Sequence, residues 1–324
     1  MQYRNLGRSG LRVSALCLGT MQFGWTASEE ESDRILTEAL EAGINFIDTA
    51  DVYSRWVPGN PGGVAEAILG KWLRASPERR RQVVLATKVR GPMGDGPNDE
   101  GLSRVHIQEA VQGSLRRLGA EAIDLYQLHW PDDRTPIDET LRALDNLVER
   151  GLVRHIGASN FAAWKVLQAL WTSDRLGLAG FVSIQPHYNL VHRSEFEREL
   201  EPACVACGLG VLPYSPLAGG FLTGKYLREQ PPPAGSRAEK SGQMQKLIKD
   251  PRSWAVVDEA EQIAARHGAS LSQVALAWLL ARPAVTSPII GPRSLEQLHD
   301  NLGALGLQLT EEEQMALAQR SDWS

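Results

Sequence analysis

Val83–Lys88, VVLATK, is a short apolar run rich in β-branched residues. Ser103–Leu118, SRVHIQEAVQGSLRRL, follows it and has apolar residues at helical spacing. A second apolar run comes next, at Leu125–His129. A strand, a helix and another strand in this order predict a parallel β-α-β unit, because parallel strands need a long crossover connection.

This strand–helix pattern recurs along the chain. The expected strands are Ala15–Gly19, Asn45–Asp48, Val83–Lys88, Leu125–His129, His155–Ala158, Phe181–Gln185, Gly210–Tyr214 and Ser287–Gly291. The expected helices between them are Ser28–Glu41, Ala65–Leu73, Ser103–Leu118, Ile137–Glu149, Ala162–Trp171 and Glu195–Cys207. Eight alternations with short connections predict an α/β fold, a closed (β/α)8 TIM barrel formed by residues 1–324 as one domain.

Three segments depart from the regular alternation. Tyr3–Val13 is typical of a β-hairpin, which we expect to plug the bottom of the barrel. Tyr226–Asp250, after the seventh strand, is polar and contains Pro231–Pro233, so it predicts a long functional loop. Further helices are expected at Trp254–His267, at Ser270–Leu280 and from Thr310 onward.

Composition excludes several classes of protein. The chain of 324 residues has a net charge of −5 without a basic stripe, which disfavours nucleic acid as a partner. No run of eighteen apolar residues and no N-terminal signal segment is present, so we expect a cytoplasmic protein without a membrane partner. Three cysteines do not describe a disulfide framework, and no metal-ligand spacing occurs, so no metal site is expected.

Polar residues follow three neighbouring strands where these end. Asp48 and Tyr53 follow the second strand, Lys88 ends the third, and His129 ends the fourth. Taken singly, each has a structural explanation, such as a lysine reaching solvent or a hydrogen-bonded histidine. Together they predict one site, because the carboxyl ends of barrel strands share a face. A lysine beside the phenol of Tyr53 is expected to lower the phenol's pKa from about 10.

This combination favours one reaction class. A phenol acid, an ammonium, a carboxylate and an imidazole suit the protonation of an oxygen while another group attacks the carbon. Neither a nucleophile nor a metal constellation accompanies them in the sequence. Hydride from a nicotinamide is therefore the expected attacking group.

Three motifs resemble those of the aldo-keto reductase superfamily: Asp48–Tyr53 (DTADVY), Leu85–Lys88 (LATK) and Leu128–Asp132 (LHWPD). Their order and approximate spacing are similar too, and the resemblance covers essentially the whole chain. It implies a catalytic tetrad of Asp48, Tyr53, Lys88 and His129, with Tyr53 as proton donor. It also implies the NADPH-dependent reduction of aldehydes or ketones to alcohols.

The sequence has no G-x-G-x-x-G after a strand, so the common dinucleotide fingerprint is absent. The resemblance instead implies that Ser159, Asn160 and Gln185 bind the nicotinamide carboxamide and that Tyr214 stacks on the ring. For Asn160, a helix cap is the alternative. Further expected cofactor contacts are Thr20, Met21, Asp48, Ser215, Leu217, Gly219, Leu222, Gly224 and Lys225.

Gly219–Lys225, GGFLTGK, imitates a phosphate-binding P-loop. Tyr226 stands where that motif needs Ser or Thr to hold magnesium, and no helical run follows directly. The resemblance implies a glycine-rich belt over the pyrophosphate. A plain turn is the alternative.

The residues after the last strand favour a phosphate site. Gly291, Arg293 and Ser294 precede a helix at Leu295–Leu302, and the start of a helix attracts anions. Arg293 suits a 2′-phosphate, while Gln297 and Asn301 are one turn apart and could reach the adenosine. NADP is therefore the expected cofactor, with NAD as a weaker alternative.

Tryptophans follow three of the strands directly and are the expected walls of the substrate site: Trp25, Trp56 and Trp130, beside Tyr53 and His129. They favour small-molecule aldehydes or ketones with hydrophobic bodies. Ala65 stands where many similar sequences carry serine, so the substrate cannot be transferred by analogy through that loop. Cys204 and Cys207 have C-x-x-C spacing but lie at a helix C-terminus, which indicates packing rather than redox chemistry.

Two other functions stay open. Barrels of this kind also occur as nicotinamide-binding redox-sensing subunits with little turnover, although an intact tetrad favours an enzyme. A barrel hydrolase or aldolase would need a metal cluster or a Schiff-base lysine. Lys88 could be that lysine only if the presence of Tyr53 and of the site at Arg293 were accidental. The substrate, the direction of flux and the oligomeric state do not follow from the sequence.

Overall fold

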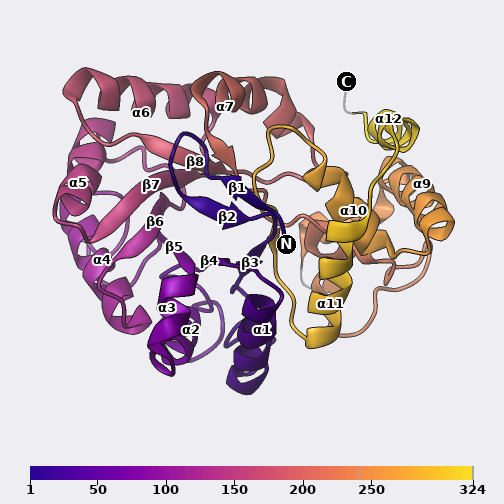
Figure 1. Ribbon diagram of the computed structural model, residues 1–324, viewed down its shortest axis with the longest axis horizontal. Coiled ribbons are helices and arrows are strands. Elements are labelled where there is room, and N and C mark those ends of the chain that lie inside the picture. The colour runs from indigo at the N-terminus through magenta and orange to yellow at the C-terminus, as the bar shows by residue number, and fades with distance from the viewer. Residues whose placement is uncertain (240, 323–324) are drawn as a thin grey trace.

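The computed structural model describes residues 1–239 and 241–322. Lys240, in the expected loop, and the last two residues of the expected domain lie outside the described residues. Eight parallel strands are hydrogen-bonded in the order β10-β3-β4-β5-β6-β7-β8-β9 (Figure 1). They are β3 (Cys17–Gly19), β4 (Phe46–Asp48), β5 (Val84–Val89), β6 (Ile123–Leu128), β7 (Val153–Ser159), β8 (Phe181–Gln185), β9 (Gly210–Val211) and β10 (Ile289–Ile290).

The seam between β9 and β10 is held by few contacts. Val211 forms an isolated parallel bridge with Val285, and the backbone N–H of Ile289 donates to the carbonyl of Pro213 at 2.8 Å. The two strands are shorter than the expected Gly210–Tyr214 and Ser287–Gly291, because Pro213 and Pro288 have no N–H to give to a ladder. The expected (β/α)8 architecture is confirmed.

The N-terminal hairpin closes one end of the barrel. Strands β1 (Tyr3–Asn5) and β2 (Arg12–Ser14) pair antiparallel, and Leu6 and Val13 are buried in the core inside the barrel. At the tip, Gly7 has a φ of +54°, and a Cβ there would meet the carbonyl oxygen of Val182 at 2.2 Å. Only glycine allows this close approach, and the expected plug is confirmed (Figure 1).

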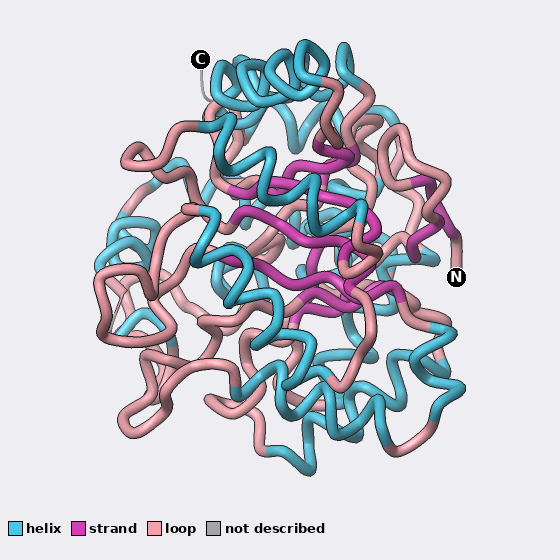
Figure 2. The backbone as a smooth tube through the Cα atoms, turned by 90° about the vertical axis from the view of Figure 1, so that its left-hand side faces the viewer, coloured by secondary structure: helices cyan, strands magenta, loops and turns pink. Residues whose placement is uncertain are grey.

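Helices surround the strands on the outside (Figure 2). Alternate residues of a strand serve two cores: Leu125 packs inside the barrel, whereas Tyr126 packs outward against the helices. The α-helices that precede β9 in the chain are α1 (Glu29–Glu41), α2 (Val64–Arg74), α3 (Pro77–Gln82), α4 (Arg104–Leu118), α5 (Ile137–Glu149), α6 (Ala163–Leu176) and α7 (Glu201–Cys207).

Three of these helices differ from expectation, and one of them, α3, was not predicted at all. The expected helix Glu195–Cys207 begins as a π-helix, η1 (Phe196–Leu200), and becomes α7 only afterwards. Pro202, at the start of α7, lacks an N–H and interrupts the regular ladder. Helix α6 continues beyond the expected Trp171 until Gly177, which ends it in the left-handed conformation.

The insertion after β9 is more ordered than the loop expected at Tyr226–Asp250. It contains η2 (Ala218–Thr223), η3 (Arg237–Glu239) and α8 (Gly242–Lys249), and the buried Met244 of α8 joins the main core. Ser241 starts α8 by accepting a hydrogen bond from the N–H of Met244. The remaining helices are α9 (Pro251–His267), α10 (Leu271–Leu280), α11 (Leu295–Gly303), η4 (Ala304–Gly306) and α12 (Glu311–Arg320).

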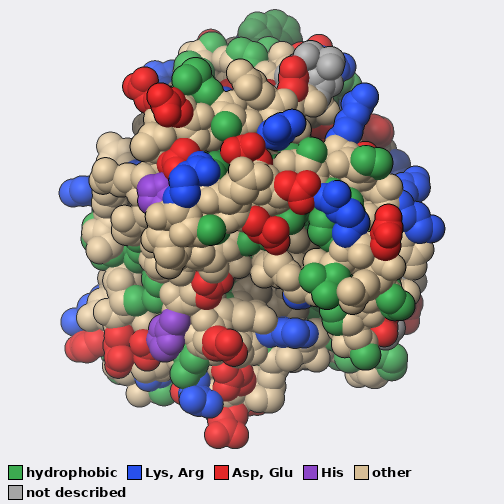
Figure 3. All heavy atoms as spheres, turned by 90° about the vertical axis from the view of Figure 1, so that its right-hand side faces the viewer, with side chains coloured by type: hydrophobic (Ala, Val, Ile, Leu, Met, Phe, Trp, Pro, Cys, Tyr) green, Lys and Arg blue, Asp and Glu red, His purple; other side chains and the backbone are tan. Residues whose placement is uncertain are grey.

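Basic and acidic side chains are interspersed on the face shown in Figure 3, and neither sign dominates it. Within residues 1–239 and 241–322, no helix combines the length and apolar character needed to span a bilayer.

Candidate active site

A cavity of about 1490 Å³ opens at the carboxyl ends of the strands. It brings together most of the residues predicted for the site: Met21, Trp25, Asp48, Tyr53, Trp56, His129, Trp130, Ser159, Asn160, Gln185, Tyr214, Ser215, Leu217, Gly219, Lys225, Gly291, Arg293, Gln297 and Asn301. Thr20, Lys88 and Leu222 are fully buried behind its wall, and the exposed Gly224 is not part of that wall. Lys88 therefore acts on the cavity only through neighbouring residues.

Lys88 is completely buried, and its ammonium has three oxygen partners. It forms an ion pair with the Asp48 carboxylate and donates to the Tyr53 phenol oxygen and the Thr49 carbonyl, both at 2.9 Å. All three donors of the ammonium are thus satisfied, which is what a buried cation requires. The expected meeting of Asp48, Tyr53 and Lys88 is present in the structure.

Asp48 is held from its other side by two glutamines. The amide nitrogens of Gln127 and Gln185 donate to its second carboxylate oxygen at 2.8 and 3.0 Å. Gln127 was not among the predicted residues. A signal existed, because a glutamine within the apolar strand β6 must face either solvent or a polar partner.

The pKa of Tyr53 corrects one expectation. Burial raises the pKa of the Tyr53 phenol above its ordinary value, and the opposing effect of Lys88 does not overcome it. For Lys88, burial works against the charge, but Asp48 and Tyr53 outweigh it and raise its pKa. At neutral pH the site therefore holds a neutral phenol beside an ammonium.

His129 faces the same cavity as a neutral ring. Burial, together with the positive charges of Lys88 and Arg90, keeps its pKa well below the usual range. Its ring lies 5.8 Å from the Tyr53 ring, centroid to centroid, and stacks on Trp130 at 3.7 Å. A neutral imidazole can donate one hydrogen bond to an oxygen without a proton being transferred.

The side chains predicted to bind a carboxamide already bond to the protein. Ser159 donates to the Gln185 carbonyl at 2.8 Å. The Asn160 amide donates to the His129 carbonyl at 2.9 Å and accepts from the Tyr214 hydroxyl at 2.8 Å. Asn160 does not cap α6. The N-cap residue of this helix is Ala162, whose side chain makes no capping hydrogen bond, so the alternative role of Asn160 as a helix cap is wrong.

A pair of glycines and two cations form one wall of the cavity. Gly219 and Gly220 both have positive φ, +65° and +98°. A Cβ on Gly220 would meet the ammonium of Lys225 at 2.4 Å, and one on Gly219 would meet the Arg237 side chain at 3.3 Å. Glycine therefore leaves room for both cations beside a half-buried stretch of backbone.

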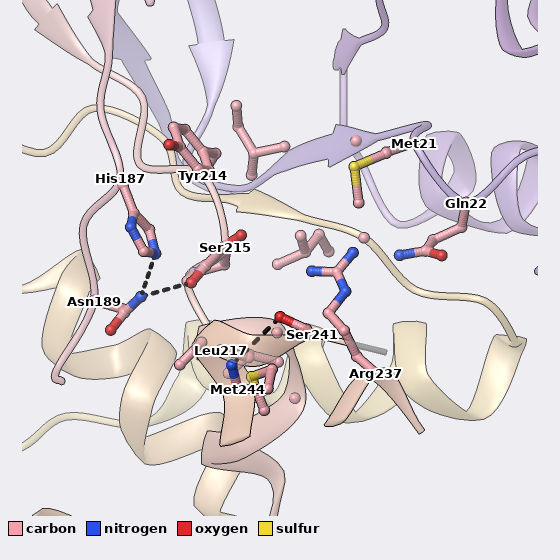
Figure 4. Close-up of a pocket in the computed structure, with 18 of the residues that line it drawn as sticks. Met21, Gln22, His187, Asn189, Tyr214, Ser215, Leu217, Arg237, Ser241 and Met244 are labelled. Atoms are coloured by element: carbon pink, nitrogen blue, oxygen red, sulfur yellow. Dashed lines mark hydrogen bonds between the residues drawn. The ribbon is translucent and has the colours of Figure 1, made fainter. Parts of the chain in front are cut away.

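Arg237 is a residue that the sequence analysis missed. Figure 4 shows its side chain extending into the cavity from the insertion after β9. Burial lowers the pKa of Lys225, and the positive charges of Arg293 and Arg237 lower it further. Among the described residues these three cations have no carboxylate within salt-bridge distance, which is unusual for a cluster of like charge.

Arg293 stands at the start of α11, as expected. Ser294 caps this helix by accepting from the N–H of Gln297, and the Gln297 side chain accepts from the N–H of Arg293 at 3.1 Å. The Gln297 side chain thus helps to order the turn that carries Arg293. Asn301 is almost buried one turn later and still contributes to the cavity wall.

Tryptophan rings line the cavity next to Tyr53. The rings of Trp25 and Trp56 meet edge to face at 5.5 Å, and Trp56 meets Tyr53 at 6.2 Å. Trp25, Trp56 and Trp130 are each 40–48% exposed. Large aromatic surfaces left in contact with solvent at a cavity mouth are typical of a ligand-binding wall.

The cysteines show no sign of a redox site. Cys204 and Cys207 are unpaired thiols at the C-terminal end of α7, and burial raises the pKa of Cys204 to about 12. This agrees with the expected packing role. In the part of the chain that the structure describes, no group of His, Cys, Asp or Glu has the arrangement of a metal site.

Known proteins resemble this chain over nearly its full length. Residues 15–321 match the Aldo/keto reductase family. The sequence is 44% identical to the "Uncharacterized oxidoreductase YrpG" of Bacillus subtilis (strain 168), over 96% of this chain and 93% of that protein. It is 40% and 36% identical to proteins named "Probable voltage-gated potassium channel subunit beta" from Oryza sativa subsp. japonica and Arabidopsis thaliana, each over 94% of this chain and 91% of the relative.

The fold, the site and these matches define an oxidoreductase built on a (β/α)8 barrel. The chain belongs to the aldo/keto reductase family.

Proposed function

We propose that this protein uses NADPH to reduce aldehydes or ketones to alcohols, with Tyr53 as the proton donor. The observation that carries the proposal is the 2.9 Å contact between the Lys88 ammonium and the Tyr53 phenol, at the wall of a cavity lined by tryptophans. Membership of the aldo/keto reductase family supports a carbonyl substrate and a nicotinamide cofactor. The proposed location is the cytoplasm, and residues 1–324 are proposed to be one domain.

The cavity fits a dinucleotide together with a second small molecule. Its volume of about 1490 Å³ exceeds the roughly 300–1,000 Å³ of a pocket for one small ligand. Cations without carboxylate partners and aromatic rings both line it, and the two groups meet where the Arg237 guanidinium lies 6.0 Å from the centroid of the Trp25 ring. A bound nicotinamide cofactor would supply the hydride, and the phosphates would lie beside Lys225, Arg237 and Arg293.

Tyr53 can supply the proton because its phenol stays protonated at neutral pH. When it gives the proton to a carbonyl oxygen, the resulting phenolate lies next to the Lys88 ammonium and is stabilised by it. Asp48 keeps Lys88 charged and in place, and Gln127 and Gln185 hold Asp48.

His129 completes the site as a hydrogen-bond donor. Because burial and nearby cations keep its ring neutral, it can orient a carbonyl oxygen toward Tyr53 without competing as an acid. Stacking on Trp130 restricts the rotation of the ring.

We infer a preference for NADP over NAD from the cluster of three cations. An extra phosphate brings additional negative charge, which relieves the repulsion among Lys225, Arg237 and Arg293. NAD remains the weaker alternative cofactor. Of the predicted contacts, Thr20 and Leu222 could act only by supporting the wall, because both are fully buried.

The aromatic wall indicates substrates with apolar bodies. Trp25, Trp56 and Trp130 offer large apolar rings, and a fixed charge, that of Arg237, approaches them only at Trp25, so a small hydrophobic aldehyde or ketone fits this wall better than a sugar phosphate.

A second candidate is a nicotinamide-binding redox-sensing subunit with little turnover. It is favoured by the similarity to two proteins named as potassium channel subunits beta. The two candidates differ in turnover rather than in binding. An assay of NADPH oxidation with a panel of apolar aldehydes, alongside direct titration of NADPH fluorescence, separates them. NADPH binding without oxidation in the presence of every aldehyde of the panel would support the sensor and contradict the enzyme.

A further inference from the structure

Tyr214 lines the cavity and is fixed at its hydroxyl end. The hydroxyl donates to Asn160, whose amide in turn donates to the carbonyl of His129 at 2.9 Å. The ring of Tyr214 is thereby connected to the strand end that carries His129. A single hydrogen bond at the tip still leaves the tilt of an aromatic ring free.

A second contact restricts that tilt. The His187 ring is parallel to the Tyr214 ring within 9°, with 5.2 Å between centroids. His187 also stacks on His192 at 3.9 Å between centroids, with 25° between the ring planes. Tyr214, His187 and His192 thus form a row of three rings beside the cavity (Figure 4 shows the first two).

The backbone explains why these rings align. The N–H of Tyr214 donates to the carbonyl of Pro186 at 3.0 Å, and His187 and Tyr214 form an isolated parallel bridge beyond the ends of β8 and β9. Residues paired in this way place their side chains on the same face of the sheet.

Asn189 holds the edge of the His187 ring. Its amide nitrogen lies 3.4 Å from Nε2 of His187 and donates to the carbonyl of Ser215 at 2.9 Å, as the dashed lines in Figure 4 show. Ser215 follows Tyr214 directly in the chain. Asn189 therefore ties His187 to the same segment that carries the tyrosine.

The His187 ring is uncharged near neutral pH. Burial lowers its pKa to about 4, and the neighbouring His192 contributes to this shift. A neutral ring can pack against a phenol face without placing a positive charge next to the cofactor site. Such a charge would oppose the positive charge that a nicotinamide gains when it gives up hydride.

We propose that His187 is a positioning residue, which holds the Tyr214 ring flat so that the nicotinamide is presented to the substrate at the correct distance. This rests on the proposed function, in which Tyr214 stacks on the nicotinamide. His187 itself lies at the cavity wall, and the role proposed for it is exerted through the Tyr214 ring on which it stacks. Loss of the ring leaves Tyr214 with its single tether to Asn160, and misplacement of a reacting group by about 1 Å costs up to ~100-fold in rate.

The test compares His187→Ala with His187→Phe. Phenylalanine restores a flat ring without a nitrogen, so it is expected to restore most of the function that alanine loses. For His187→Ala we expect the Kd for NADPH, measured by fluorescence titration, to rise roughly 3- to 10-fold, as for the loss of an aromatic contact. We expect kcat to fall on the order of tenfold while KM for the aldehyde changes little, since the aromatic substrate wall is untouched.

The isotope effect provides a readout that a merely structural role would not move. With 4-deuterated NADPH, the primary isotope effect on kcat should grow in His187→Ala, because hydride transfer becomes slower relative to cofactor release. His299→Ala is the matched control. His299 is an exposed histidine on α11 that pairs with Glu38, and its replacement should leave every parameter at the wild-type value.

Failure of this inference is distinguishable from failure of the proposed function. If the wild-type protein oxidises NADPH and Tyr53→Phe does not, the proposed function stands independently. If His187→Ala then matches the wild type in Kd, kcat and isotope effect, or if His187→Phe is no better than alanine, the positioning role is overturned.

Discussion

The ammonium of Lys88 lies 2.9 Å from the phenol oxygen of Tyr53, although the two residues are 35 positions apart in the chain. The phenol nevertheless keeps its proton, because burial raises its pKa more than the cation lowers it. In the proposed reaction the lysine therefore matters most after Tyr53 has given up its proton. This relationship leads to the first prediction.

Tyr53→Phe should lower kcat for aldehyde reduction by about 100-fold or more, the usual contribution of a positioned acid. NADPH affinity should survive, because the ring is retained and only the hydroxyl is lost. Steady-state oxidation of NADPH and fluorescence titration measure the two quantities. Tyr3→Phe, which removes a hydroxyl bonded to Gly43 on the surface, is the control. Retained turnover would remove Tyr53 from the acid role.

Lys88→Met should destabilise the protein by roughly 3–5 kcal/mol, because it leaves the Asp48 carboxylate buried without a counter-charge. The double variant Asp48→Asn/Lys88→Met should recover part of this loss, since no uncompensated charge remains. Urea unfolding followed by circular dichroism gives both values. A double variant as unstable as the single one would show that the charge pair is not the reason.

Arg237→Ala and Arg293→Ala should each weaken NADPH binding by roughly 10- to 100-fold, as expected for lost charge-assisted contacts to phosphate. NADH binding should weaken less with Arg293→Ala, because NADH lacks the 2′-phosphate. Titration of both cofactors measures the difference. The control is Arg228→Ala in the same insertion, where the guanidinium pairs with Asp258 at the surface. Equal losses for the two cofactors with Arg293→Ala would contradict a 2′-phosphate contact.

Asp51→Asn should stabilise the protein near neutral pH. Both carboxyl oxygens of Asp51 are buried without a hydrogen-bond partner among the described residues, and burial, with Glu66 nearby, raises the pKa well above its ordinary value. A carboxyl with a raised folded pKa binds its proton more tightly in the folded state. Stability is therefore lost as pH rises from about 4, the unfolded pKa, through the folded pKa.

The neutral asparagine does not pay this penalty, so the difference in unfolding free energy between Asp51→Asn and wild type should shrink from about pH 7 to about pH 4. Urea titrations at both pH values test it. The exposed Asp258→Asn should show a much smaller dependence. A constant difference at both pH values would mean that Asp51 titrates as in the unfolded chain.

Trp56→Ala should raise KM for aldehydes with large apolar bodies by roughly tenfold and leave the smallest aldehydes nearly unaffected, because only the former reach the aromatic wall. A chain-length series of aldehydes provides the measurement. Trp171→Ala, which removes a ring 62% exposed on α6, is the matched control. The same change in KM across the whole series would remove Trp56 from the substrate wall.

Sequence order alone brought Asp48, Tyr53, Lys88 and His129 to one face. The alternation of strands and helices makes the strands parallel and neighbouring, and the carboxyl ends of such strands meet at the same end of a barrel. The hairpin plug and the helix start at Arg293 follow from equally local signals. These features depend on near neighbours in the chain, which is why pattern is enough to predict them.

The tertiary structure decided what depends on distant segments. Arg237 reaches the cavity from the insertion after β9, and nothing in its local sequence points to that site. Gln127 and Gln185 converge on Asp48 from two different strands, and Tyr53 keeps its proton only because the surrounding chain excludes water. Desolvation and packing sum contributions from many residues at once. The direction of a pKa shift such as that of Tyr53 therefore follows from the folded structure and not from a linear sequence pattern.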